Sequence, residues 1–296
     1  MGKNYLKYIL SLLIFGSNGI IASGIGLSST RIVLFRTITG SLFLSAVLLA
    51  GKDKPRLGEI KRQLIPSAVS GISMGLSWIF LFEAYRQSGV STATLMYYCG
   101  PVIVMALSPF VFKERLEGGK IFGIVIVLVG MVLVNGADFL NSGLSFGMAC
   151  GLLSAVLYAL MIISNKKIKG ISGIEITWMQ LITAFVVVFL CSVFTDRSPV
   201  IISTEGFIRL LILGIVNTGL GCFLYFSSIN VMPAGSVAIL SYIDPLSALV
   251  FSSVFLSEHL SLQQAVGAGL ILCGAAAGEL LFSHRRKNRE TVKNTV

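Results

Sequence analysis

The chain has 296 residues, of which 55% are hydrophobic and only 12% are charged, and its mean hydropathy is +0.88. Soluble domains have an apolar share of about 45–50% and a charged share of about 25%, so this composition excludes a soluble globular protein. The sequence therefore predicts an integral membrane protein.

Apolar runs of about 20 residues, the length needed to cross about 30 Å of hydrocarbon, recur along the chain. They predict ten spans, at 5–23, 31–50, 64–86, 91–112, 119–136, 145–164, 174–194, 207–228, 235–257 and 262–282. No small-residue cleavage pattern follows the first span, so we expect a mature helix there and not a signal peptide. The predicted fold is an all-α bundle with no soluble domain.

The formal net charge of +10 is distributed as a membrane topology requires, so we expect no nucleic-acid partner. Eighteen of the 23 basic residues fall on one side of the predicted spans. By the positive-inside rule, both ends of the chain are then cytoplasmic and the protein lies in the cell membrane. The basic tail at 285–296 is expected to anchor this topology and to contact anionic lipid.

Two segments align without a gap at an offset of 144 residues, 75–134 on 219–278. The alignment superposes Tyr98 on Tyr242 and Pro101 on Pro245. The offset encloses five predicted spans, an odd number, so the second copy must be inverted in the membrane. We predict a first five-helix repeat at 1–140 and a second, inverted one at 141–284, an arrangement that many secondary transporters use to build two gates around one site.

Both repeats carry a proline near the middle of a span, in Gly100-Pro101 and in Asp244-Pro245. At 1.5 Å per residue, each pair lies about 14 Å into the membrane. A proline inside a helix removes one backbone hydrogen bond, and the carbonyls that it frees must face protein or water. Paired breaks of this kind predict the binding site of a transporter. The alternative is that the prolines only kink their helices.

Asp244 is the acidic residue that the predicted spans place at the bilayer centre, where a carboxylate costs at least about 2.5 kcal/mol. Two functional interpretations are open, since it could bind the amine of a substrate or another cation, or carry a coupling proton. The structural alternative is that Asp244 accepts hydrogen bonds from Tyr98 or from the backbone near the break.

Aromatic residues cluster around the two breaks and on the predicted spans 64–86 and 207–228. We predict an aromatic cavity that holds apolar rings and ammonium groups, with Asn217 as a polar contact and Asn18 and Gln180 as weaker candidates. The aromatic candidates are Tyr97, Tyr98, Tyr242, Trp78, Phe82 and Tyr225. The alternative is that these aromatic side chains face lipid or form an interface belt, which is what we expect of Trp178.

Three charged residues lie at the outer ends of their spans, and we interpret Glu83, Arg86 and Arg36 as a gate or structural ion pair. Glu114 and Glu258 are expected to cap the helices that follow them. The glycines of the spans 119–136 and 262–282 suit a scaffold or a homodimer face.

The five cysteines all lie inside predicted spans and form no CxxC pair, so they predict neither a disulfide framework nor a metal site. The sequence contains no Walker loop, no HExxH and no nucleophile elbow, and we expect no cofactor. An intramembrane enzyme would need a second titratable group beside Asp244 at the same depth, and none is placed there by the sequence.

The paired prolines and the glutamates that close the same two spans resemble the EamA-type branch of the drug/metabolite transporter superfamily. The matching segments are Gly-Pro-Val-Ile at 100–103 with Lys-Glu-Arg-Leu at 113–116, and Asp-Pro-Leu at 244–246 with Ser-Glu-His-Leu at 257–260. The resemblance covers essentially the whole chain. It implies a bacterial inner-membrane carrier, usually an exporter of amino acids or related metabolites, often thought to work by proton exchange.

The leading hypothesis is therefore a secondary carrier, expected to export an amino acid or another small amine by alternating access. The second is a carrier of organic cations or drugs, favoured if no group in the cavity meets a carboxylate. An enzyme and a passive sensor or scaffold are the remaining classes, and paired helix breaks have no use in a passive bundle.

Overall fold

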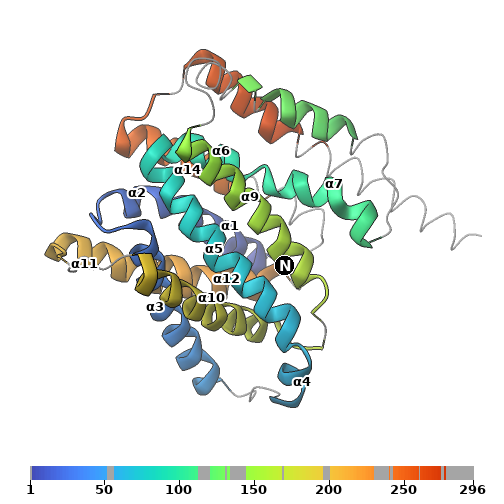
Figure 1. The fold of residues 1–296 in the computed structure, drawn as a ribbon, viewed down its shortest axis with the longest axis vertical. Helices are drawn as coiled ribbons and strands as arrows, with labels where there is room; N and C mark the ends of the chain where they lie inside the picture. Colours follow the sequence, from blue (N-terminus) through green and yellow to red (C-terminus); the bar gives the residue numbers. More distant parts are fainter. Residues whose placement is uncertain are drawn as a thin grey trace, which may run out of the picture.

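The computed structural model describes residues 2–51, 57–112, 121–130, 132–133, 145–168, 170–195, 201–229, 240, 243–259, 261–274 and 277. All regular elements in these ranges are helical (Figure 1). They are α1 (Gly2–Gly16), α2 (Asn18–Ser23), α3 (Ser29–Ala50), α4 (Leu57–Arg62), α5 (Leu64–Ser88), α6 (Val90–Tyr97), α7 (Gly100–Phe112), α9 (Phe146–Asn165), α10 (Gly173–Thr195), α11 (Thr204–Leu211), the π-helix η1 (Ile212–Leu220), α12 (Gly221–Ile229) and α14 (Ile243–Leu256), with two further helices at Ile121–Gly130 and Leu262–Gly274.

Six helical segments are long and apolar enough to cross a membrane: Lys3–Ser23, Ser29–Ala50, Leu64–Ser88, Phe146–Asn165, Gly173–Phe194 and Thr204–Tyr225. Four shorter apolar helices lie at Val90–Val104, Ile121–Gly130, Ile243–Leu256 and Leu262–Gly274. Large apolar side chains point outward from the bundle, as Phe110 and Leu262 do at 81% and 83% exposure. The prediction of an all-helical membrane protein is therefore confirmed.

Serine side chains cap the N-termini of several helices. Ser28, Ser145 and Ser203 each accept a hydrogen bond from the backbone N–H three residues further on, at the beginnings of α3, α9 and α11. This N-cap satisfies one of the donors that the first turn of a helix leaves free. Gly89 joins α5 to α6 with a φ of +79°, a conformation that favours glycine.

The α5 helix packs between α9 and α10 (Figure 1). Polar side chains join the three helices. Ser77 on α5 and Ser154 on α9 each donate to the other's carbonyl oxygen at 2.9 Å. Gln180 on α10 donates to Ser70 Oγ at 2.7 Å and to Asn165 Oδ1 at 2.5 Å. In hydrocarbon such bonds hold helices together because apolar side chains gain little by leaving lipid.

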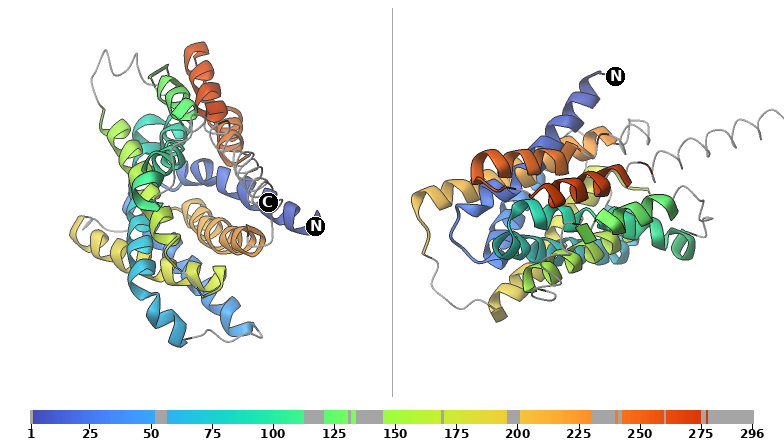
Figure 2. Two further views of the ribbon diagram at one scale, coloured as in Figure 1. Left: turned by 90° about the vertical axis from the view of Figure 1, so that its right-hand side faces the viewer. Right: turned by 90° about the horizontal axis from the view of Figure 1, so that it is seen from above.

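The two glycine-rich helices, Ile121–Gly130 and Leu262–Gly274, lie against each other at one end of the bundle (Figure 2). A Cβ atom on Gly130 would approach the Gly267 carbonyl oxygen to 2.7 Å, and one on Gly274 would approach the Gly123 carbonyl oxygen to 3.0 Å. The missing side chains therefore let these backbones approach closely, as small residues do in membranes.

Three membrane helices depart from regular α geometry. The first is interrupted at Ser17 between α1 and α2, and another at Tyr98 and Cys99 between α6 and α7. The third helix is continuous from α11 to α12 but contains the π-helical segment η1. Within η1, Thr218 Oγ1 donates a hydrogen bond to the Leu213 carbonyl, five residues back, at 2.9 Å. Such π segments occur frequently at functional sites.

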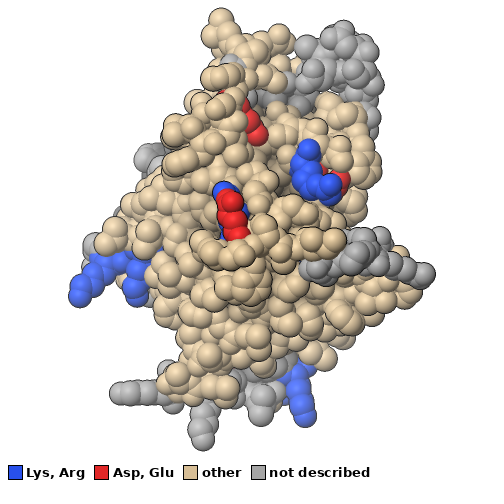
Figure 3. All heavy atoms as spheres, turned by 90° about the vertical axis from the view of Figure 1, so that its left-hand side faces the viewer, with Lys and Arg blue, Asp and Glu red and all other residues tan. Residues whose placement is uncertain are grey.

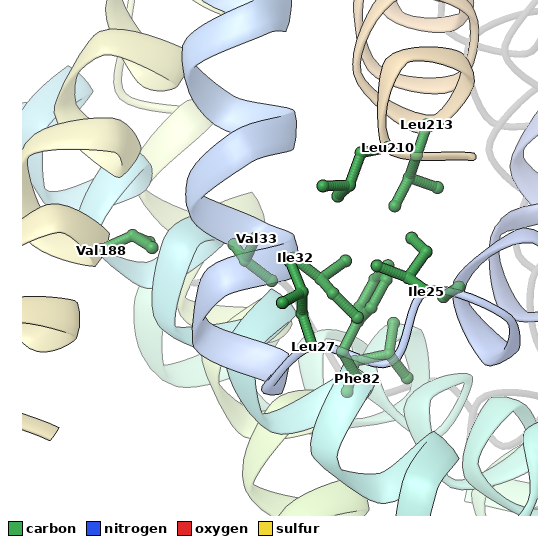
Figure 4. Packing of buried hydrophobic residues seen from close by; sticks show 10 residues of the cluster. Ile25, Leu27, Ile32, Val33, Phe82, Val188, Leu210 and Leu213 are labelled. Atoms are coloured by element: carbon green, nitrogen blue, oxygen red, sulfur yellow. The ribbon is translucent and has the colours of Figure 1, made fainter. Parts of the chain in front are cut away.

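A buried apolar cluster lies beside the connection between α2 and α3 (Figure 4). Leu210 and Leu213 reach into it from α11 and η1 and meet Ile25 and Ile32, while Phe82 enters from α5. The face in Figure 3 carries few charged side chains on a largely uncharged surface.

Candidate functional site

The side chains of Tyr98 and Asp244 join the break between α6 and α7 to the beginning of α14. The Tyr98 hydroxyl donates a hydrogen bond to Asp244 Oδ2. The two residues are 146 positions apart in the chain. The bond therefore brings the helix break next to Gly100-Pro101 into contact with Asp244, the acid that the sequence placed at the bilayer centre.

Asp244 lies in the first turn of α14, and Pro245 follows it inside that turn. A proline is tolerated there because the first N–H groups of a helix have no partner within the helix. Gly16, at the end of α1, fits against this turn, since a Cβ on it would approach the Asp244 carbonyl oxygen to 3.0 Å. Residues 230–239 and 241–242, including the candidate Tyr242, lie outside the described residues.

Gly100 and Pro101 begin α7, directly after the break at Tyr98 and Cys99. A Cβ atom on Gly100 would approach Tyr158 Cδ1 on α9 to 2.5 Å and the Ala155 carbonyl oxygen to 3.1 Å. Glycine at this position therefore lets the ring of Tyr158 pack over the break.

Two aromatic groups surround the Tyr98–Asp244 contact. The Tyr97 ring lies edge-on to Tyr98 and Tyr158, with centroids 5.6 Å and 5.0 Å apart. Tyr225 on α12 packs against Tyr8 on α1 with a centroid distance of 5.4 Å. Tyr8 is fully buried, and neither Tyr8 nor Tyr158 was among the predicted residues, because neither lies near a proline or in the aligned segments.

Trp78 and Phe82 lie one turn apart on α5, and the guanidinium of Arg36 from α3 is placed over both rings. The Arg36 Cζ atom is 4.2 Å from the Trp78 centroid and 5.1 Å from that of Phe82. Arg36 Nε donates to Thr218 Oγ1 in η1 at 3.0 Å, and the whole residue is only 2% exposed. A buried arginine in a membrane costs at least about 2.5 kcal/mol on insertion scales, so it needs a compensating partner or a function.

Tyr85 and Tyr97 connect the surroundings of Arg36 with those of Asp244. The Tyr85 ring lies 5.4 Å from that of Phe82, and the Tyr97 ring lies 5.6 Å from that of Tyr98, which donates to Asp244. Tyr97 also packs against the apolar cluster that contains Phe82. Packed aromatic side chains therefore connect the rings beneath Arg36 with the tyrosine that contacts Asp244.

Asn217 is 1% exposed, and its amide nitrogen donates to the Ile14 carbonyl at 2.6 Å and to Ser17 Oγ at 2.9 Å. One bond goes to the backbone and the other to a side chain where α1 is interrupted, so both donors of Asn217 are already used. Of the weaker candidates, Gln180 joins α10 to α5 and α9, whereas Asn18 carries a buried side-chain oxygen that has no hydrogen-bond partner among the described residues.

Glu83 forms an ion pair with Arg86, with an N–O distance of 3.1 Å, and accepts further hydrogen bonds from Ser29 and Gln87. Arg36, which we had grouped with these two residues, lies instead over Trp78 and Phe82. The reason is that Arg36 is placed a further two turns into α3 from Ser29, the residue of that helix which contacts Glu83.

The site offers one carboxylate with a tyrosine donor, one arginine and several aromatic faces. Among the described residues, no group of three or more His, Cys, Asp and Glu side chains could hold a metal ion.

Comparison with known proteins agrees with this architecture. The profile of the EamA-like transporter family matches the chain twice, over residues 3–136 and 145–277. The chain is 27% identical to the Uncharacterized transporter YxxF of Bacillus subtilis over 92% of this chain and 88% of that protein. It is 26% identical to the Uncharacterized transporter YoaV of the same organism over 97% and 100% of the two chains.

The chain is also 25% identical to Protein PecM of Dickeya dadantii, over 86% of each chain. A solved crystal structure shares the fold, with a TM-score of 0.69 and 21% identity over 94% of this chain and 98% of that one. The family predicted from the proline and glutamate motifs is confirmed, and the chain is a membrane transporter that belongs to the EamA-like transporter family.

Proposed function

We propose that this protein is a secondary carrier that exports an amino acid or a related small amine across the cytoplasmic membrane by alternating access. The observation that carries the proposal is the hydrogen bond from Tyr98 to Asp244, at the meeting point of a helix break and a helix start. An acid held at this point by the Tyr98 hydroxyl is well placed to receive a substrate ammonium group, and the surrounding rings favour the same ligand.

The proposed architecture consists of two inverted five-helix repeats, at 1–140 and 141–284. The two separate matches of the family profile support two units of similar sequence. The basic residues support cytoplasmic ends for the chain. The contact between the two glycine-rich helices supports the scaffold interpretation of their glycines over a homodimer face, because these glycines meet each other within one chain.

The test is counterflow in proteoliposomes with a panel of amino acids and primary amines, comparing the natural protein with Asp244→Asn. The variant is expected to remain folded and inserted but to lose concentrative transport. If Asp244 binds the amine, substrate affinity falls in direct binding. If it carries a coupling proton, binding survives and transport no longer responds to a pH gradient. Natural binding together with natural pH-driven transport in the variant would return Asp244 to a structural role.

A carrier of organic cations is the second candidate, and the aromatic faces around Asp244 favour it. Quaternary ammonium compounds in the same counterflow panel distinguish the two, because an organic-cation carrier accepts them and an amino-acid carrier does not. Everted membrane vesicles, loaded from the cytoplasmic face, test the direction of export.

A further inference from the structure

Within the part of the chain that the structure describes, Arg36 is a buried cation without an anionic partner. Each carboxylate whose side chain the structure describes contacts another group: Glu83 contacts Arg86, Glu175 contacts Ser172, Glu205 contacts Arg209, Asp244 contacts Tyr98, and Glu258 contacts Val90 and Ser91. The hydrogen bond that Arg36 forms within the described residues uses Nε, which leaves both terminal nitrogens of the guanidinium without an acceptor.

The surroundings of Arg36 hold its guanidinium in one orientation. The rings of Trp78 and Phe82 support its face, and Thr218 accepts from Nε. Thr218 itself is oriented by η1, because its hydroxyl proton goes to the Leu213 carbonyl and its lone pair is left for Arg36. Gly40 and Gly214 keep α3 and η1 close enough for this bond, since a Cβ on either would collide with Thr218 or Thr39.

A planar guanidinium fixed at Nε and on its face presents its two terminal nitrogens as a fork. That geometry matches a carboxylate, which can accept two parallel hydrogen bonds from it. Thr218 and the two rings are uncharged and cannot neutralise the buried cation. A ligand carboxylate would supply both the missing charge and the missing acceptors.

We propose that Arg36 is the receptor for the carboxylate of the substrate, so that the transported molecule is a zwitterion held between Arg36 and Asp244. This inference rests on the proposed function and makes it more specific, because it separates amino acids from simple amines and organic cations. Tyr97 links the two ends of the proposed site, because it packs against the cluster that contains Phe82, beneath Arg36, and its ring lies 5.6 Å from that of Tyr98, which donates to Asp244. A zwitterion neutralises both buried charges at once, whereas a simple amine leaves Arg36 unpaired.

The test uses tryptophan fluorescence, since the chain has only two tryptophans. In a Trp178→Phe background, Trp78 beneath Arg36 is the remaining reporter. The ligands are alanine, leucine, threonine and phenylalanine, each offered as the free amino acid, as its methyl ester and as its decarboxylated amine. For the amino acid that binds, we expect roughly ten- to hundredfold tighter binding than for its ester and amine.

In Arg36→Gln this preference for the free acid should disappear, and in Arg36→Lys it should fall partway, because lysine keeps the charge but not the fork. Arg86→Gln is the matched control, since it removes an exposed arginine paired with Glu83, and it should leave the preference unchanged. A monodisperse elution profile and a melting temperature near that of the parent establish that each variant is folded. If Arg36→Gln does not fold, the role of Arg36 is judged from the parent protein alone, by comparing its binding of the free acid, the ester and the amine.

Equal binding of free acid, ester and amine to the parent protein would overturn the role of Arg36 and leave an amine carrier centred on Asp244. A preference for the free acid that persists in a folded Arg36→Gln variant would overturn it as well. Failure of every ligand to bind or to be transported would instead reject the proposed function itself, together with this inference.

Discussion

Glu258 accepts a hydrogen bond from the backbone N–H of Val90, with an N–O distance of 2.7 Å, although the two residues are 168 positions apart. Its other carboxylate oxygen accepts from the N–H of Ser91 at 2.8 Å. Glu258 therefore caps the beginning of α6. We had predicted that it would cap the helix that follows Glu258 in the sequence. That following helix, Leu262–Gly274, has its own cap, in which Ser261 and Gln264 exchange side chain-to-backbone hydrogen bonds.

We predict that Glu258→Ala lowers the free energy of unfolding by roughly 1–3 kcal/mol, because two N–H donors at the start of α6 lose a charged acceptor. Glu258→Gln should lose less, since the amide oxygen can still accept one bond. Thermal unfolding in detergent measures both effects. Glu205→Gln is the control for Glu258→Gln, because Glu205 pairs with Arg209 on an exposed face. An equal loss of stability in these two variants would mean that the cap adds nothing to the free energy of unfolding.

Tyr98→Phe should weaken substrate binding less than Asp244→Asn does. The substitution removes the hydroxyl that holds the carboxylate but keeps the carboxylate itself and the aromatic ring. A hydrogen bond to a charged group contributes roughly 1.5–3 kcal/mol, so we expect at least about a tenfold rise in Kd. Isothermal titration with the transported substrate measures this change, and an unchanged Kd would show that Tyr98 does not position Asp244.

Gly100→Ala should destabilise the protein by roughly 1–3 kcal/mol, because the added methyl group collides with Tyr158 on α9. Gly269→Ala is the matched control, since it places the same methyl group on a helix with nothing within 4 Å. Melting temperatures of the two variants in one detergent provide the comparison. A Gly100→Ala protein as stable as Gly269→Ala would show that α7 can move away from α9 at no cost.

Thr218→Val should selectively weaken the binding of free amino acids by about tenfold, because valine has the shape of threonine but cannot accept the bond from Arg36 Nε. The binding of methyl esters should change little. Thr37→Val is the control, since Thr37 bonds only to carbonyls of its own helix. Equal losses for acids and esters would mean that Thr218 supports the helix and not the orientation of Arg36.

The distribution of apolar residues was enough to predict the membrane class and most helix positions. The predicted spans 31–50 and 64–86 correspond to Ser29–Ala50 and Leu64–Ser88 in the structure. The reason is that hydrocarbon thickness sets a minimum length for any apolar helix that crosses it. The proline and glutamate motifs were likewise enough to identify the family, because they recur in register at a fixed offset.

Partners across the bundle could not be predicted in this way. The interruption of the first helix at Ser17 involves no proline. The bonds from Asn217 to the Ile14 carbonyl and to the Ser17 hydroxyl link residues 203 and 200 positions apart. No local feature of the sequence predicts that Tyr8 packs against Tyr225 or that Tyr158 packs against Tyr97.

By itself, the sequence was enough to predict a chain that crosses the membrane many times, with helix breaks at two prolines, and to identify a transporter of a known family. The tertiary structure alone decided that Arg36 lies over Trp78 and not beside Glu83, and that Glu258 caps α6. Hydrophobicity and proline geometry act on each segment locally, whereas the partner of a buried charge depends on which helices pack together, and that is settled only when the whole bundle forms.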